Sequence, residues 1–109
     1  MTHVWYHCFE SELKVDPSQH NVLVTESFYN HKKNREKMTE IFFEHYGVQG
    51  FYAAIQGVLS LYSVGRTTGV VLDSGMKTTV CVPVYESFPM SHAYKKTSIA
   101  GRAVTEHVL

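Results

Sequence analysis

Residues 54–75 constrain the fold more than any other part of this 109-residue chain. A strand-like apolar run leads through Gln56 into a short apolar segment of helical length, and after a glycine-bounded turn a second apolar run stops at Asp73-Ser74-Gly75. A buried strand that ends in a carboxylate and a glycine turn can present an acid and free backbone N–H groups to a phosphate. Asp-Ser-Gly is also an ordinary hairpin turn, so the pattern alone leaves both interpretations open.

Residue strings along nearly the whole chain resemble the actin family, in the family's order and without evident gaps. The matching strings are Trp5, residues 12–15 with Pro17, 22–26, 34–41, 43–44, 54–75, 82–86, 91–93 and 100–102. The resemblance implies an α/β fold of the actin and Hsp70-type ATPases (ribonuclease H-like), in which Mg-ATP is clasped between two β-hairpins. The chain would cover part of one lobe, the connecting helix and a β-hairpin of the second lobe.

The resemblance also implies a division into two parts. Residues 1–64 would belong to the first, small lobe and end in the interlobe helix, and residues 65–109 would begin the second, large lobe with its phosphate-loop hairpin. The family's first phosphate hairpin would lie before Met1, and most of the adenine pocket would lie after Leu109. Apolar faces and strand edges would then need to be covered by a partner, because both favour association when exposed.

The resemblance assigns site residues to this chain one position at a time. Gln56 matches the glutamine that orients the attacking water, and Asp73 matches an acid that reaches Mg²⁺ through water. The positions that match the family's nucleotide-binding residues are Asp73, Ser74, Gly75, Met76, Lys77 and Gly101. The implied cofactor is ATP or ADP with Mg²⁺, although a site without any cofactor is an open alternative.

Three positions near this site depart from the family's pattern. Met76 replaces an acid, and a thioether is a poor substitute for the hard oxygen ligands that Mg²⁺ prefers. Lys77 replaces a glycine, and a side chain there would disfavour positive φ and close approach to phosphate. Val80 replaces a histidine that helps to polarise the water, and general acid–base help contributes roughly 10²–10⁴ in rate. We therefore expect a degraded site, although Lys77 could add a positive charge near a phosphate.

Composition limits the partners that the chain can have. Ten basic and ten acidic residues give a formal net charge of zero, which provides no electrostatic reason to expect nucleic acid or an anionic membrane. The N-terminus lacks a secretion signal, and the apolar segment at 51–64 is too short to span a bilayer. Cys8 and Cys81 are expected to be buried, reduced thiols.

Periodicity predicts further elements. Helices are expected at residues 3–13, 32–46 and from 99 onward, and strands at 22–25, 51–55, 70–72 and 78–84. Gly47 has the position of a residue that ends a helix in the left-handed conformation. His3, His7 and Cys8 lack a third convergent ligand, so ordinary surface positions are favoured over a metal site. The basic cluster at 31–35 is expected to be a solvated helix face.

These features favour an actin-like cytoskeletal or structural protein that acts through protein–protein contacts and hydrolyses little or no ATP. The alternative is a segment of an active, polymerising Mg-ATP-binding ATPase, which is favoured by Gln56 and Asp73. A third possibility is a module that docks onto actin or an actin-binding protein. The family favours the cytoplasm and the cytoskeleton, and leaves the nucleus and the cilium open.

Overall fold

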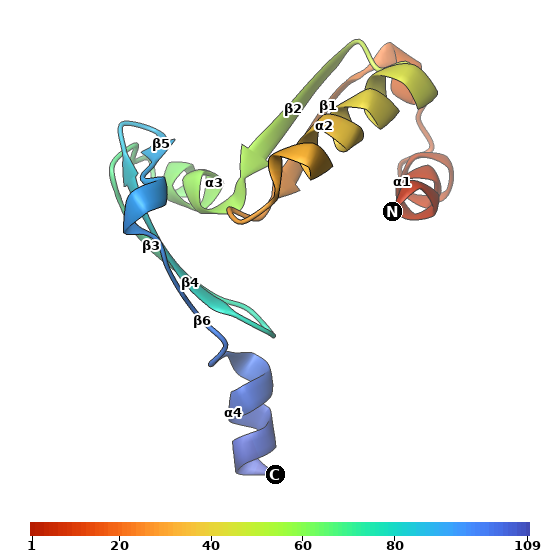
Figure 1. Ribbon diagram of the computed structural model, residues 1–109. Helices are drawn as coiled ribbons and strands as arrows, with labels where there is room; N and C mark the ends of the chain where they lie inside the picture. The colour runs from red at the N-terminus through yellow and green to blue at the C-terminus, as the bar shows by residue number, and fades with distance from the viewer. The chain divides into compact units, whose positions relative to one another are not determined.

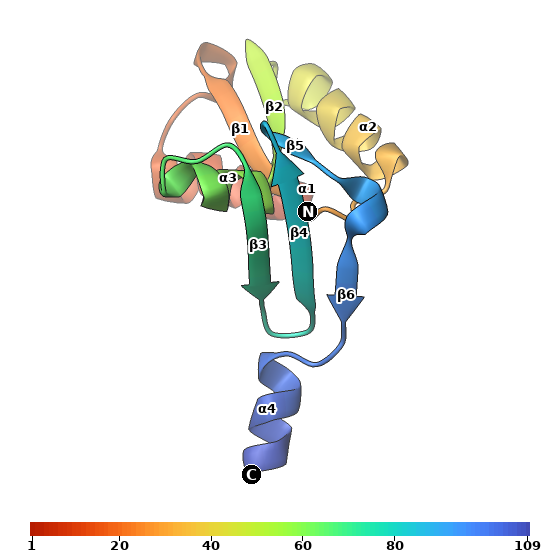
Figure 2. The same cartoon turned by 90° about the vertical axis from the view of Figure 1, so that its left-hand side faces the viewer.

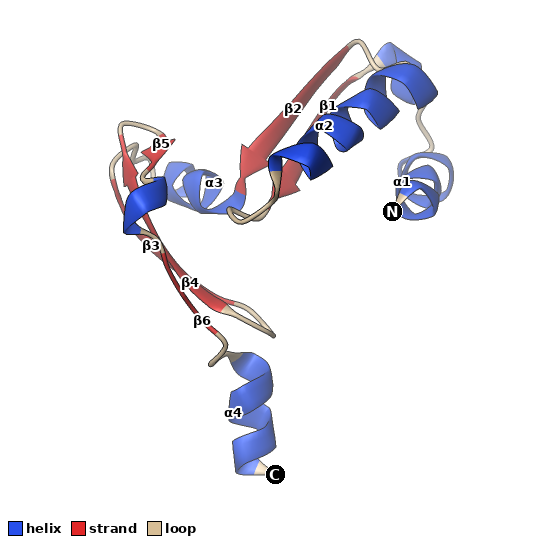
Figure 3. Ribbon diagram, in the orientation of Figure 1, coloured by secondary structure: helices blue, strands red, loops and turns tan.

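The computed structural model, which describes residues 1–109, contains both helices and strands in each half of the chain (Figure 3). They form two compact units, Met1–Ala54 and Ile55–Leu109, which are described separately below. The units part just before the helix α3 (Gln56–Ser63), whereas the expected lobes part just after it. A compact unit need not coincide with a lobe of the family, so the lobe assignment stays a prediction. No helix has both the length and the apolar character to cross a bilayer.

The first unit is built on a β–α–β arrangement preceded by helical turns. Its elements are α1 (Thr2–His7), the π-helix η1 (Cys8–Leu13), the 3₁₀ turn η2 (Pro17–Gln19), β1 (Asn21–Glu26), α2 (Lys32–Glu40), the π-helix η3 (Ile41–His45) and β2 (Gly50–Ile55). Strands β1 and β2 pair, their arrows run in the same direction, and α2 lies along them (Figure 1). The helices and strands expected in this half of the chain are therefore confirmed.

Local signals explain where these helices end. Lys14 adopts a left-handed conformation (φ 53°) after η1. Gly47 adopts one (φ 62°) after η3, which confirms its predicted position at the end of a helix. Asp16 then caps η2, because its carboxylate accepts hydrogen bonds from the Ser18 hydroxyl at 2.7 Å and the Ser18 N–H at 2.9 Å. These two hydrogen bonds hold the pKa of Asp16 below its ordinary value.

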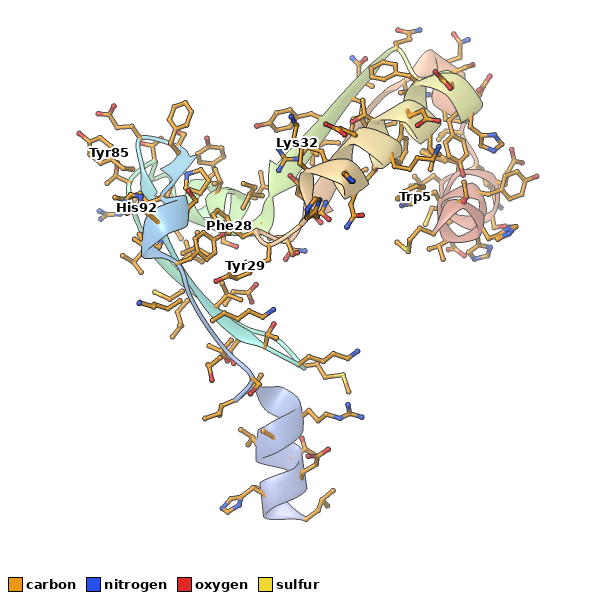
Figure 4. The ribbon with its side chains drawn as sticks, in the orientation of Figure 1. Trp5, Phe28, Tyr29, Lys32, Tyr85 and His92 are labelled. Carbon is orange, nitrogen blue, oxygen red and sulfur yellow. The ribbon has the colours of Figure 1, made fainter.

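Aromatic side chains form the core of the first unit. Phe42 is 1% exposed, and the rings of Trp5 on α1 and of Phe51 on β2 each lie 4.8 Å from its ring, centroid to centroid. Trp5 is labelled in Figure 4. Phe9 and Tyr46 complete the cluster, and the Tyr46 hydroxyl donates to the Thr2 carbonyl at 2.8 Å. Burial raises the pKa of Tyr46. The cluster joins the N-terminal helix to the β–α–β arrangement.

A buried carboxylate lies at the end of β1. The Glu26 side chain is 3% exposed, and its Oε1 is paired with Arg35 Nη2 on α2. Asn30 Nδ2 donates to Glu26 Oε2 at 2.8 Å. Residues 31–35 are all exposed, as expected of a solvated face, although Arg35 also pairs with this buried acid.

The second unit is a small antiparallel sheet with one helix packed against it and another that begins beside its long hairpin turn. Its elements are α3, β3 (Gly69–Ser74), β4 (Thr79–Tyr85), β5 (Phe88–Pro89), the 3₁₀ turn η4 (Ser91–Ala93), β6 (Lys95–Thr97) and α4 (Gly101–Val108). Strand β4 pairs with β3, β5 and β6, and Figure 2 shows β3 and β6 on either side of it. The predicted hairpin and C-terminal helix are confirmed, whereas β5 and β6 were not foreseen.

The two faces of the β3–β4 hairpin differ in burial. Val82 and Val84 pack with Val58 and Leu61 of α3 in the core of this unit. A Cβ added to Gly57 would lie 3.2 Å from Val82 Cγ1, so the glycine permits α3 to approach the hairpin closely. The opposite face carries exposed apolar residues, among them Val70 and Leu72 of β3.

The turn between β4 and β5 uses two residues with positive φ, Glu86 (44°) and Ser87 (71°). Two-residue hairpin turns of this kind favour glycine or asparagine. Here the loop before β3 stabilises the turn, because the Ser87 N–H donates to the Thr67 carbonyl at 2.7 Å and the Glu86 N–H donates to the Thr68 hydroxyl at 3.0 Å. This support explains why a hairpin forms without its usual sequence signal. Tyr85, labelled in Figure 4, lies at the end of β4 away from α4.

The buried ion pair in the first unit gives a test of stability. Arg35→Ala leaves the Glu26 carboxylate buried with one partner fewer, and we expect it to lower the free energy of unfolding by about 3 kcal/mol. Lys37→Ala removes an exposed pair to Glu40 (2.6 Å) on the same helix and should cost less than about 1 kcal/mol. Urea unfolding followed by circular dichroism measures both, and equal losses would contradict the buried-pair account.

Candidate functional site

The β3–β4 turn, residues 75–78, holds half of the positions that the sequence assigned to a nucleotide, and Asp73 and Ser74 lie just before it at the end of β3. The strand register pairs Ser74 with Thr79 at its base, and the Gly75 N–H donates to the Thr78 carbonyl at 3.0 Å. Lys77 does not adopt positive φ. This agrees with the expectation that a side chain at this position disfavours positive φ, and the turn closes without such a conformation.

The start of α4 is fastened to this turn. The Gly101 N–H donates to the Gly75 carbonyl at 3.0 Å, and the Arg102 N–H donates to the Met76 carbonyl at 2.8 Å. A Cβ on Gly101 would lie 3.2 Å from the Gly75 oxygen, which explains the glycine at that position. The structure thus brings Gly101 together with Gly75 and Met76, although these residues are far apart in the sequence.

The Ser74 hydroxyl is engaged within the protein. It lies 2.8 Å from the Thr79 hydroxyl, which in turn donates to the Ile99 carbonyl at 2.7 Å. Sequence analysis did not single out Thr79, because only the strand register places it beside Ser74. Side chains alternate along a strand, so the pairing of Thr79 with Ser74 could have been predicted if the length of the turn had been known, because the turn length sets the strand register.

Asp73 lies on the face of the hairpin that α3 covers. The register places Asp73 opposite Val80, and Val71 opposite Val82 of the core. Residues two apart along a strand share a face, so Asp73 and Val80 lie on the same side as the core valines. Gln56 is the first residue of α3 rather than the last of β2, and both Gln56 and Asp73 are exposed.

The donor groups at the turn fit hydrated Mg²⁺ poorly. Asp73 is the one carboxylate among residues 73–80, and the exposed Met76 offers a soft thioether where an acid would serve better. Mg²⁺ is usually held by one or two carboxylates together with waters and substrate phosphates. No group of three or more His, Cys, Asp or Glu side chains in the structure could hold a metal ion.

The remaining candidate residues lie elsewhere. His7 Nε2 is 3.2 Å from Glu12 Oε1 on the first unit's N-terminal helix. Cys8 and Cys81 are free, and both are half-buried. The expectation that these thiols are buried is therefore wrong in degree, because Cys81 lies on the outer face of β4 and Cys8 lies on a helix that is partly open to solvent.

The family model of actin matches residues 1–109, which is the whole chain. The chain belongs to the actin family. Its mixed α/β architecture is accordingly a partial actin-like fold, and the family is a nucleotide-binding one.

Lys77 lines a surface depression beside α4 in this actin-family turn. The depression is also lined by Ser98, Arg102, Ala103 and Glu106. Arg102 Nε lies 3.3 Å from Glu106 Oε1, so one of the two cations there is already partnered by an acid. Lys77 therefore brings a positive charge to the side of the turn that faces α4.

The contact between Gly101 and the turn is open to mutation. Gly101→Ala should force α4 away from the Gly75 carbonyl and lower the free energy of unfolding by about 1 kcal/mol, the lower limit for overpacking. Thr105→Ala, on the same helix but without a contact to the turn, should stay within about 0.5–1 kcal/mol of the parent chain because it removes only an exposed hydrogen bond. Backbone amide shifts of Gly75 and Met76 should move only in the Gly101 variant, and unchanged shifts there would contradict the close-approach account.

Proposed function

We propose that this actin-family chain is a cytoskeletal or structural protein that acts through protein–protein contacts, with a weakened ATP-phosphate site and little or no hydrolysis. The observation that carries the proposal is the chemistry of the β3–β4 turn. Asp73, at the end of β3, is the single carboxylate near this turn, and Met76 in the turn offers a thioether. The Ser74 hydroxyl and the Gly75 N–H are engaged within the protein. Few groups remain to bind a hydrated Mg²⁺ and a phosphate chain.

Hydrolysis needs a positioned water as well as a bound phosphate. Gln56 is retained, but Val80 stands opposite Asp73 where the family's histidine would help to polarise that water. A valine can neither accept nor donate a proton, so this position supplies no general acid–base help. We therefore propose that Gln56 and Asp73 are remnants of a catalytic arrangement whose other members have been replaced.

Protein–protein contacts are supported by the exposed apolar faces of both units. Val70 and Leu72 project from the outer face of β3, and Leu23 and Tyr52 are exposed on β1 and β2. Contiguous exposed apolar side chains on a sheet are typical of surfaces that bind a protein. We propose that actin, actin-binding proteins or a larger assembly of related proteins cover these faces, in the cytoplasm and its cytoskeleton.

The two-lobe assignment belongs to the same proposal. Residues 1–64 would serve as part of the small lobe with the interlobe helix, and residues 65–109 would open the large lobe. The proposed boundary falls just after the end of α3 at Ser63, where Gly65 takes a positive φ of 72°.

An active, polymerising ATPase is the second candidate. It is favoured by the retention of Gln56 at the start of α3 and of Asp73 on the hairpin face that α3 covers. In this case the chain would bind Mg-ATP and release phosphate. One binding experiment separates the two candidates.

Restoring the family's residues should restore nucleotide affinity. We expect the full chain to bind Mg-ATP weakly, and the triple variant Met76→Asp, Lys77→Gly, Val80→His to bind it at least about tenfold more tightly, because it regains a hard oxygen ligand and a polar group. Met76→Leu is the matched control and should leave the affinity unchanged. Isothermal titration with Mg-ATP, with a phosphate-release assay, measures the effect. Micromolar affinity with phosphate release by the parent chain would favour the active ATPase instead.

The apolar face of β3 should contribute to association. Leu72→Glu places a charge on this face and should weaken co-sedimentation of the full chain with actin filaments by at least about tenfold, the effect of burying an uncompensated charge at an interface. Val64→Glu introduces the same charge at a position of similar exposure (68% against 71%) outside the sheet and should have little effect. Equal binding by both variants and the parent would contradict the assignment of this face.

A further inference from the structure

We propose that Thr79 is a positioning residue, which holds the proton of Ser74 and fastens the β3–β4 turn to the backbone before α4. The inference concerns a chain of hydrogen bonds, here called the hydroxyl relay, that runs from the Ser74 hydroxyl through the Thr79 hydroxyl to the Ile99 carbonyl. The predicted effect of the relay on phosphate binding rests on the proposed function of the turn. The hydrogen bonds of the relay do not depend on that proposal.

The direction of the relay follows from counting protons. A hydroxyl has one proton to donate, whereas a backbone carbonyl can only accept. Thr79 donates its proton to Ile99 across 2.7 Å. The contact of 2.8 Å between Thr79 and Ser74 therefore requires Ser74 to be the donor.

This direction limits what Ser74 can bind. Phosphate oxygens at neutral pH mainly accept hydrogen bonds, so a serine that binds them must donate its proton. Ser74 has already donated that proton to Thr79, and it presents only lone pairs to solvent. A phosphate that recruits the Ser74 hydroxyl must first break the relay.

The relay ends where α4 begins. Ile99 is two residues before Gly101, whose N–H donates to the Gly75 carbonyl, and Arg102 donates to Met76 in the same way. The hydroxyl relay and these two backbone bonds therefore connect the same two segments, the turn and the start of α4. Anion binding at Ser74 would loosen one of three links between them, so Thr79 couples the state of the turn to the anchoring of α4.

Amide hydrogen exchange of the full chain without any ligand tests the link to α4. Thr79→Val keeps the shape of the side chain but removes its hydroxyl, and the Gly101 and Arg102 amides should exchange about fivefold faster relative to the amides of α3, the effect of losing one typical hydrogen bond. Thr79→Ser retains the hydroxyl and should keep the parent rates. Unchanged rates at Gly101 and Arg102 in Thr79→Val, or an equal acceleration of all amides in this unit, would overturn the link.

Titration with inorganic phosphate, followed by the amide shifts of Gly75 and Met76, tests the proton assignment. Thr79→Val frees the Ser74 proton, so it should bind phosphate several-fold more tightly than the parent chain. Adding Ser74→Ala should abolish this gain, and Thr79→Ser should bind like the parent. A Thr79→Val variant that binds no more tightly, or a parent chain whose affinity falls on Ser74→Ala, would overturn the assignment. If no variant binds phosphate, the proposed effect on anions and the proposed residual phosphate site are both overturned. The hydrogen-exchange experiment still tests the link between Thr79 and α4 separately.

Discussion

The antiparallel register of β3 and β4 governs the chemistry of the second unit. Pairing Asp73 with Val80 and Ser74 with Thr79 places the acid on the face that α3 covers and the two hydroxyls on the other. A slip of one residue would exchange these faces, because side chains alternate along a strand. The core valines prevent such a slip, since Val82 and Val84 must face α3 to be buried. Packing of the core thus fixes the geometry of the candidate site.

The first unit depends on a different constraint, the burial of aromatic rings against one side of the helix α2 and its continuation η3. Met38, Ile41 and Phe42 form the apolar stripe that helical periodicity predicts, and all three belong to or pack against the core. This unit also contains a buried carboxylate, which is stabilised by residues close to it in the sequence. Glu26 at the end of β1 is partnered by Arg35 and Asn30, so the loop between β1 and α2 is held at both ends.

Strong periodic segments were predictable from the sequence, and weak ones were not. The helix at 32–46 and the hairpin around Asp73 carry enough apolar residues to be recognised without tertiary information. Strands β5 and β6 were not predicted because they have only two and three residues. In addition, the turn before β5, Glu86-Ser87, lacks the glycine or asparagine of a usual hairpin turn. The ion pair between Arg35 and Glu26 was not predicted either, because charge patterning along a helix cannot show a buried acid on a neighbouring strand.

The sequence by itself determined membership of the actin family, because a family match depends only on which residue follows which. By resemblance, it also predicts which residues match the family's phosphate hairpin, with Met76 and Val80 in place of polar groups. Only the tertiary structure decided that the Ser74 hydroxyl is directed to Thr79, that Gly101 lies against the turn, and that Lys77 fits without positive φ. Each of these depends on contacts between segments that are distant in the chain, and such contacts are set by register and packing.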